Sequence, residues 1–394
     1  MKKLLLIAFT LFSMNTFAQN SRTLLMAKNS EPVKAVKFDS QRSLKDVIAS
    51  ENLKSAAKAP AKVPEGTSYA YYMDCYQSAY GFDYLCNKNH VYSEIIITSD
   101  GKAYIPNIFY TGLLGNELYL EGKVNEDGSI EIGFQNLITY QDISLYVGCV
   151  NINTGDVDKT STFKLSYDKD YNAYMSSEES YLGVYMEYSG DLYLDTYCCY
   201  FTYLPENAYA ETTKHSYSFL DKDDKTQNTT VDMIDLGDNY FYINNIMPGY
   251  ENVWLLGSFE NNNMNIYSYQ IATDNVSFFF IDQSGNLLNE STLTYNSSDN
   301  TYKTDDGTSF ADIIYDDGST SGEEGYYLYS NILSNMSIGA STTAISNVEN
   351  SNKDVVATEY FDLSGRRISN AAQGVSIMVS KYADGTSKAI KIMK

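Results

Sequence analysis

Two stretches of this sequence align with each other and decide the expected fold: Gly101-Lys-Ala-Tyr-Ile-Pro-Asn-Ile-Phe109 and Asn239-Tyr-Phe-Tyr-Ile-Asn-Asn-Ile-Met247. Further blocks follow in the same order: Leu118–Gly122 matches Val253–Gly257, Phe134-Gln135 matches Tyr269-Gln270, and Leu165–Tyr167 matches Leu293–Tyr295. The offset falls from 138 through 135 to 128, which places the gaps in loops. Ordered blocks of this kind predict two related modules, each of roughly 130 residues, a normal domain size.

The local pattern in both modules is that of β-strands. Polar and apolar residues alternate in Ser129–Phe134 and Met264–Tyr269, as in half-buried strands. Asp-Gly dipeptides, which favour hairpin turns, begin at Asp100, Asp127, Asp306 and Asp317. The predicted fold class is therefore all-β, with two tandem related β-sandwich or β-meander modules and a small C-terminal β domain.

Composition shifts divide the chain into six expected segments. They are a signal peptide (1–18), a leader and linker (19–65), module 1 (66–205), module 2 (206–335), a linker (336–352) and a C-terminal β domain (353–394). Lys2 and Lys3 precede an apolar stretch that ends with small residues at Thr16 and Ala18, the plan of a cleavable signal peptide. Export with cleavage near Ala18 is therefore predicted, without an integral membrane segment in the mature chain.

The net charge of −22 is unevenly distributed. Residues 66–352 contain 41 acidic residues, 10 Lys and no Arg, whereas both flanking segments are basic. An acidic, arginine-free region repels nucleic acid and lacks the guanidinium groups that clamp phosphates and carboxylates. Neutral partners such as glycans, or bound cations such as Ca²⁺, remain compatible with this charge.

Cysteines and histidines offer no evident catalytic or metal constellation. The five cysteines are Cys75, Cys86, Cys149, Cys198 and Cys199. In an exported chain Cys75 could pair with Cys86, and Cys198 or Cys199 with Cys149, but spacing leaves the pairing open. No paired Cys-x-x-Cys knuckles occur, and the two histidines are far apart in the sequence.

One segment has the oxygen-ligand spacing of a calcium loop. Asp168, Asp170, Asn172 and Glu179 stand at positions 1, 3, 5 and 12. Ala173, however, occupies the position that needs Gly, so a hairpin turn between Tyr167 and Tyr174 is favoured and no cofactor is predicted. Trp254 matches Tyr119 in the repeat, which favours packing over sugar stacking.

The C-terminal 42 residues resemble a known export signal. They contain Glu359-Tyr-Phe-Asp-Leu-Ser-Gly-Arg-Arg-Ile368, then a strand opened by Gly374, then a basic terminal strand. This pattern resembles the C-terminal sorting domain of proteins exported by the type IX secretion system of the Bacteroidota. Asp362, Leu363, Gly365 and Arg366 match its first motif, Phe361 stands where the family usually has Tyr and keeps the aromatic character, and Gly374 opens the second motif. The resemblance implies recognition of the tail by secretion machinery, with release or attachment at the cell surface.

The two modules also resemble an uncharacterised β-rich repeat of Bacteroidales extracellular proteins, through Tyr242-Ile243, Trp254, Gly257 and Gln270. The expected function is thus a secreted or cell-surface, non-enzymatic adhesion or binding protein, with neutral glycans or surface proteins as candidate partners. Two alternatives stay open. One is a carbohydrate-active hydrolase that uses an Asp/Glu pair, and the other is a structural envelope protein.

Overall fold

The computed structural model describes residues 33–36, 63–79, 84–106, 109, 118–140, 143–188, 190–273, 276–316, 326–340, 355–361, 367–368, 375–382 and 387–393. These form two compact units, Met1–Ser341 and Thr342–Lys394. The expected signal peptide lies outside the described residues, as do Asp362, Leu363, Gly365, Arg366 and Gly374 of the C-terminal motif.

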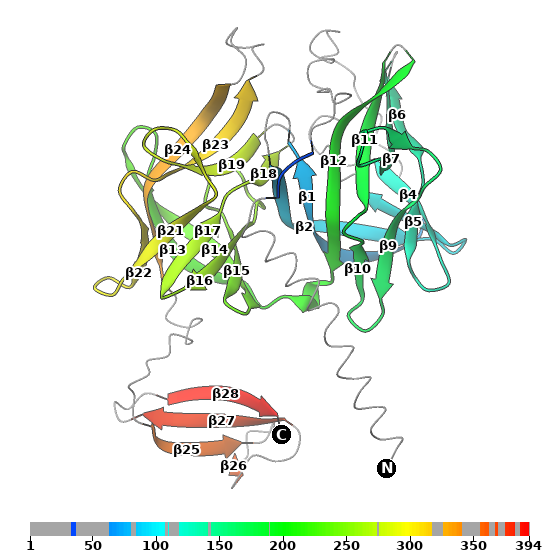
Figure 1. Ribbon diagram of the computed structural model, residues 1–394. Helices are drawn as coiled ribbons and strands as arrows, with labels where there is room; N and C mark the ends of the chain where they lie inside the picture. The colour runs from blue at the N-terminus through cyan, green and yellow to red at the C-terminus, as the bar shows by residue number, and fades with distance from the viewer. Residues whose placement is uncertain are drawn as a thin grey trace. The chain divides into compact units, whose positions relative to one another are not determined.

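The first half of the larger unit is a closed antiparallel barrel, in which the last strand pairs with the first (Figure 1). Going round the barrel, its strands are β1 (Thr67–Ser78), β2 (Leu85–Ile97), β3 (Lys102–Pro106), β4 (Tyr119–Val124), β5 (Ile130–Ile132), β9 (Phe163–Asp168), β10 (Ala173–Ser176) and β12 (Asp191–Leu204). Outer strands β6 (Gln135–Tyr140), β7 (Ile143–Val150), β8 (Val157–Asp158) and β11 (Tyr181–Tyr188) attach through the β11–β12 pair.

The second half repeats this strand order as a second closed barrel. Its strands are β13 (Thr213–Leu220), β14 (Thr226–Gly237), β15 (Tyr240–Asn244), β16 (Leu255–Glu260), β17 (Asn263–Tyr267), β21 (Glu290–Asn296), β22 (Thr301–Thr304) and β24 (Tyr326–Gly339). The outer strands are β18 (Gln270–Thr273), β19 (Val276–Ile281), β20 (Leu287–Leu288) and β23 (Ser309–Asp316). Between the two barrels lies the 3-10 turn η1 (Glu206–Ala208).

The prediction of an all-β fold is confirmed, and the sheets close into barrels rather than stacking as a sandwich. Closure leaves no open edge between the first and last strands of each circuit. The predicted hairpin turns are also present, since Gly101, Gly128 and Gly307 all have the positive φ that Asp-Gly turns require. The fourth dipeptide, Asp317-Gly318, lies outside the described residues.

Strand register supports the alignment made from the sequence. Gly122 lies opposite Ala103 in the first barrel, and Gly257 lies opposite Phe241 in the second, at the offsets found in the repeat. A Cβ atom on Gly257 would lie 2.3 Å from Phe241 Cζ and 2.6 Å from the Asn265 carbonyl oxygen. The glycine is therefore needed because the phenyl ring lies against its backbone.

This close contact predicts a clear cost for the smallest side chain. Gly257→Ala should lower the free energy of unfolding by about 1–3 kcal/mol, because the added methyl group overpacks the site. Gly133→Ala is the matched control, since no atom lies within 4 Å of the added Cβ. Urea unfolding of both variants checks this: equal losses at the two positions would contradict the packing explanation.

The two barrels lie side by side, with β18 of the second next to β2 of the first (Figure 1). Gln270 of β18 pairs with Asn87 of β2, and Asn89 forms an isolated bridge with Trp254. The Asn89 side-chain amide donates to Gln270 Oε1 at 2.8 Å and to the Trp254 carbonyl oxygen at 3.2 Å. The equivalent glutamine of the first barrel, Gln135, instead bonds both backbone groups of Glu121. The repeated glutamine thus bonds the other barrel in one copy and its own barrel in the other.

A buried carboxylate and a ring cluster strengthen this junction. Asp74 is 3% exposed, and its Oδ1 accepts the His90 backbone N–H at 2.7 Å and the Tyr242 hydroxyl at 2.9 Å. The His90 ring stacks on Tyr72 with centroids 4.0 Å apart and meets Trp254 edge-on at 5.0 Å. Because Tyr242 and Trp254 belong to the second barrel, Asp74 and His90 hold the barrels together.

Part of the expected leader packs on the first barrel. Val33 accepts the Leu85 N–H at 2.7 Å, Lys34 bridges to Tyr84, and Val36 N–H donates to the Tyr197 hydroxyl at 2.8 Å. Val33 and Ala35 contact the apolar cluster that includes Tyr76 and Leu85. Residues 33–36 therefore belong structurally to the barrel, within a segment expected to be a separate leader.

The linker expected over residues 336–352 begins later than predicted. Strand β24 continues to Gly339, and Met336 and Ile338 are fully buried in the core of the second barrel. The boundary at 335 is wrong because the Ser/Asn-rich composition hid the alternating apolar positions of this strand.

The second unit is a small antiparallel sheet in the order β26-β25-β27-β28. Its strands are β25 (Val355–Phe361), β26 (Arg367–Ile368), β27 (Val375–Tyr382) and β28 (Ser387–Met393). This matches the small C-terminal β domain expected from the sequence.

Candidate functional site

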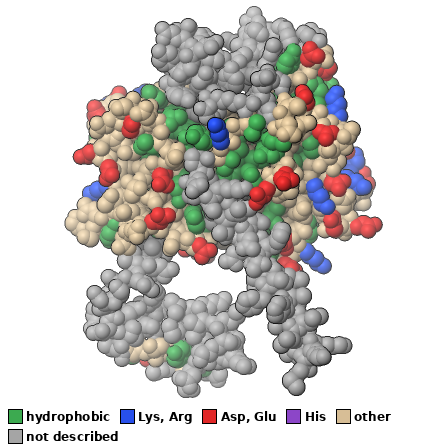
Figure 2. All heavy atoms as spheres, in the orientation of Figure 1, with side chains coloured by type: hydrophobic (Ala, Val, Ile, Leu, Met, Phe, Trp, Pro, Cys, Tyr) green, Lys and Arg blue, Asp and Glu red, His purple; other side chains and the backbone are tan. Residues whose placement is uncertain are grey.

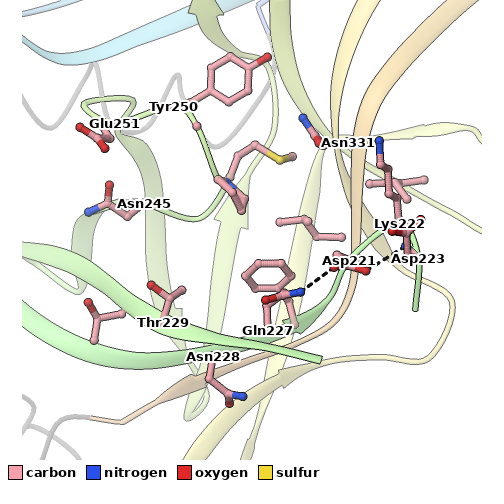
Figure 3. A pocket seen from close by; sticks show the side chains of 17 residues that line it. Asp221, Lys222, Asp223, Gln227, Asn228, Thr229, Asn245, Tyr250, Glu251 and Asn331 are labelled. Atoms are coloured by element: carbon pink, nitrogen blue, oxygen red, sulfur yellow. Dashed lines mark hydrogen bonds between the residues drawn. The ribbon is translucent and has the colours of Figure 1, made fainter. Parts of the chain in front are cut away.

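A pocket of about 570 Å³ lies at one mouth of the second barrel (Figure 3). It is formed where β13 ends and β14 begins, by the loop between β15 and β16, and by the middle of β24. The lining residues are Phe219, Asp221, Lys222, Asp223, Gln227, Asn228, Thr229, Thr230, Asn245, Met247, Pro248, Gly249, Tyr250, Glu251, Asn331, Ile332 and Leu333. Barrel mouths commonly bind small molecules, and this volume is in the usual range for ligand pockets.

The pocket combines an apolar base with a polar wall. Phe219, Met247 and Leu333 are buried members of the barrel core and also line the pocket. In Figure 3 Asn245 and Tyr250 lie on one side of the pocket, and Gln227 and Asp221 lie on the other. The wall carries amide and hydroxyl groups beside the carboxylates of Asp221, Asp223 and Glu251. All of these groups can hydrogen-bond the hydroxyls of a neutral polyhydroxylated ligand.

Asp221 organises the turn at the pocket wall. Its Oδ1 accepts the backbone N–H groups of Asp223 at 2.9 Å and Lys225 at 3.0 Å, and its Oδ2 accepts the Gln227 side-chain amide at 2.7 Å. These hydrogen bonds, the Lys225 N–H first, hold the pKa of Asp221 below its ordinary value. Asp221 is therefore an ionised acceptor at neutral pH, whereas a glycosidase acid needs a raised pKa.

A buried carboxylate fixes the opposite wall. Asp312 is 1% exposed, and its Oδ1 accepts the backbone N–H groups of Ser330 and Asn331 at 2.8 and 2.6 Å. Its Oδ2 accepts the Asn331 side-chain amide at 2.8 Å and the Tyr250 hydroxyl at 3.1 Å. Burial, together with Asp312, raises the pKa of Tyr250 to about 12. Tyr250 and Asn331 are thus positioned by one residue behind the pocket.

Two positions of the first barrel that correspond to pocket residues hold buried side chains. Strand register places Gln77 where Asp221 stands and Lys88 where Gln227 stands. Both Gln77 and Lys88 are buried, at 5% and 8% exposure. The loop that corresponds to 245–251 lies outside the described residues, apart from buried Phe109. Among the described residues, the positions of Asp221 and Gln227 in the second barrel are thus taken by buried Gln77 and Lys88 in the first.

The candidate calcium segment is a hairpin turn. Asp168 Oδ1 accepts the N–H groups of Asp170 and Tyr171, and Asn172 Oδ1 accepts the hydroxyls of Tyr71 and Tyr167 at 2.9 and 3.0 Å. Exposed Glu179 lies beyond the end of β10. The turn of the second barrel is built in the same way, since Asn300 Oδ1 accepts the Tyr295 hydroxyl and Asn296 accepts the Ser298 N–H. The predicted turn between Tyr167 and Tyr174 is confirmed by their direct pairing.

We expect Ca²⁺ to leave this protein unchanged, because the oxygens of Asp168 and Asn172 are engaged within the turn. The thermal midpoint should be the same with millimolar Ca²⁺ and with a chelator. As a control, Asp168→Ala should lower the midpoint equally in both conditions. A stabilisation by Ca²⁺ that Asp168→Ala removes would contradict this expectation.

Other candidates from the sequence are part of the packing. Trp254 lies at the junction of the barrels, next to His90, as the repeat indicated. Tyr71, Tyr197 and Tyr203 are buried, whereas Tyr92 is 56% exposed. None of the cysteines forms a disulfide in the structure, so the pairings considered for Cys75, Cys86 and Cys149 do not occur there.

Two further findings concern only the described part of the chain. No group of three or more His, Cys, Asp or Glu side chains there could hold a metal ion. Nor does that part contain a helix of the length and hydrophobicity needed to cross a membrane. Figure 2 shows acidic side chains spread over both barrels on the visible face, with fewer Lys side chains among them.

Comparisons with known proteins leave the family of the chain open. No protein-family model matches it, and no curated protein matches it in sequence. A solved structure described as a putative AttH from Nitrosomonas europaea matches over 73% of this chain and 97% of its own, with 9% identity and a TM-score of 0.17. At these values the similarity carries no argument about fold or function.

Proposed function

We propose that this chain is a secreted or cell-surface binding protein that holds a neutral saccharide in the pocket of the second barrel. The observation that carries the proposal is the pocket lining, in which uncharged amides and hydroxyls stand beside a positioned tyrosine over an apolar base. Sugars present hydroxyls at their rim and apolar C–H faces, so they match both features.

Charge favours a neutral ligand over an anionic one. Lys222 is the single cationic residue among the described pocket residues, and it stands beside Asp221 and Asp223. The surrounding region, 66–352, is arginine-free and strongly acidic. An anionic ligand would meet this field without a guanidinium to pair with.

The two ends of the chain support the extracellular location that this proposal requires. The resemblance of residues 353–394 to a type IX sorting domain supports export to the cell surface, and the signal-peptide pattern up to Ala18 supports passage across the inner membrane. A binding function outside the cell accords with both ends of the chain.

A glycan array probed with the full chain tests the proposal. We expect binding to one class of neutral glycan, and the Tyr250→Ala variant should lose it. Tyr250→Phe keeps the ring and should retain most of the signal, while Tyr92→Ala, on the outer face of the first barrel, should have no effect. Uniform silence of the wild-type protein would contradict the glycan proposal.

A further inference from the structure

Two cysteines meet in the core of the first barrel. Cys75 on β1 and Cys198 on β12 belong to the same buried cluster, with exposures of 2% and 0%. Cys198 lies opposite Gln77 across the β1–β12 pair, and its thiol donates to Gln77 Oε1 at 3.5 Å. Cys75 is two residues before Gln77, on the same side of β1, so both cysteine side chains enter the same barrel core beside Gln77. The sequence did not indicate this pair.

Strand geometry separates Cys198 from two of the other cysteines. Cys199 is the next residue on β12, so its side chain points to the opposite face, where it joins the cluster around Tyr76. Leu182 of β11 lies opposite both Cys149 and Cys198, which places these two cysteines two strand spacings apart. Two spacings are roughly 10 Å, beyond the reach of a disulfide.

Cys86 is separated from the pair by its packing. It is fully buried in a different cluster, with Tyr269 and Phe279 of the second barrel's outer strands. Its pKa is raised to about 12, chiefly by burial. Cys75 and Cys198 are therefore the two fully buried thiols of the first barrel's core cluster, and Cys149, which packs against that cluster, lies two strand spacings from Cys198.

We propose that Cys75 and Cys198 form a disulfide across the seam that closes the first barrel when the chain folds in an oxidising compartment. One thiolate attacks the disulfide of a thiol–disulfide oxidant, such as oxidised glutathione, and releases one oxidant thiol. The second thiolate then attacks the mixed disulfide and releases the other. Two protein thiols lose two protons and two electrons in total, and the oxidant disulfide becomes two thiols.

The position of the disulfide determines how it stabilises the barrel and at which stage of folding it forms. β1 and β12 are the first and last strands of the barrel, so the bond would tie together segments far apart in the sequence and restrict the unfolded chain. Burial holds the Cys198 thiol protonated in the closed barrel, so exchange is expected before closure. Once formed, the bond should resist reductants until the barrel opens.

In the second barrel, the positions that correspond to Cys75 and Cys198 hold large apolar residues. Register places Phe219 at the position of Cys75 and Leu333 at the position of Cys198, and both are core residues. The cluster there is filled by large apolar side chains, whereas the first barrel has two small thiols at these positions. A covalent bond would compensate for the smaller apolar area at this seam.

Refolding of the full chain tests the proposal. The protein is reduced and denatured, refolded with reduced and oxidised glutathione, then alkylated in denaturant and measured by mass spectrometry. We expect three alkylated cysteines, a mass lower by two hydrogens at the remaining pair, and a Cys75–Cys198 cross-linked peptide. The oxidised protein should melt about 10 °C higher than the reduced protein.

Adjacent residues on β12 provide matched controls. Cys199→Ser should keep the cross-link, whereas Cys198→Ser should lose it and leave four alkylated cysteines. Five alkylated cysteines in the refolded wild-type protein, or a cross-link through Cys86, Cys149 or Cys199, would overturn the proposal. The wild-type result is decisive even where a variant fails to fold.

Discussion

Asp312→Ala is expected to lower the free energy of unfolding by about 3–5 kcal/mol. The carboxylate is 1% exposed and accepts four hydrogen bonds, from two backbone N–H groups, the Asn331 amide and the Tyr250 hydroxyl. Removing it leaves these donors without their acceptor in a buried site, where each unsatisfied group is costly. Urea unfolding measures the loss.

The same substitution should also weaken binding, because Tyr250 and Asn331 lose the group that positions them. Asp282→Ala is the matched control, since Asp282 accepts the Ser284 and Asn286 N–H groups in an exposed turn where water can replace it. A much smaller loss is expected there. If Asp312→Ala costs no more than this control, Asp312 does not hold the pocket wall.

Asp74→Ala should loosen the contact between the barrels and cost about 3 kcal/mol of stability. Its Oδ1 joins the His90 backbone of the first barrel to the Tyr242 hydroxyl of the second. Trp254 is the single tryptophan and lies against His90, so its emission reports this junction specifically. We expect a red-shifted emission in Asp74→Ala under native conditions, because water reaches the indole.

Tyr242→Phe separates the cross-barrel bond from the rest of this effect. It removes the hydroxyl that donates to Asp74 but keeps the ring, so a loss of about 1–2 kcal/mol and a smaller spectral shift are expected. An unchanged Trp254 emission in both variants would show that Asp74 does not couple the two barrels.

Much of the fold could be predicted because its signals are local. Hairpin turns are signalled by the Asp-Gly dipeptides at Asp100, Asp127 and Asp306, and strands by the alternation of polar and apolar residues. Each signal spans only a few residues, and the strand signals recur in both copies of the repeat. Barrel closure was not predicted, because β1 pairs with β12 across most of the module and nothing in either strand specifies its partner. The end of β24 was missed for the same reason, since Met336 and Ile338 are recognised as core only once that pairing is known.

The candidate site was harder to predict than the fold. Asp221 after β13, Asn245 and Tyr250 in the loop between β15 and β16, and Asn331 on β24 come together only when the barrel closes. Asn245 was visible as a repeated position, and its positive φ of 63° agrees with a tight turn at the pocket. The turn at Asp168 and Asn172 was predicted in spite of its calcium-like spacing, because Ala173 stands where a calcium loop needs Gly, and Asx turns use the same oxygens as metal sites.

The central claim is that the pocket of the second barrel binds a neutral saccharide. Calorimetric titration of wild-type protein, Tyr250→Phe and Tyr250→Ala with the strongest glycan from the array, at low and high salt, tests it most directly. We expect wild-type affinity that is independent of salt, retained in Tyr250→Phe and at least about tenfold weaker in Tyr250→Ala, a loss of about 1.4 kcal/mol. Equal affinity in all three proteins, or affinity that falls steeply with salt, would contradict it.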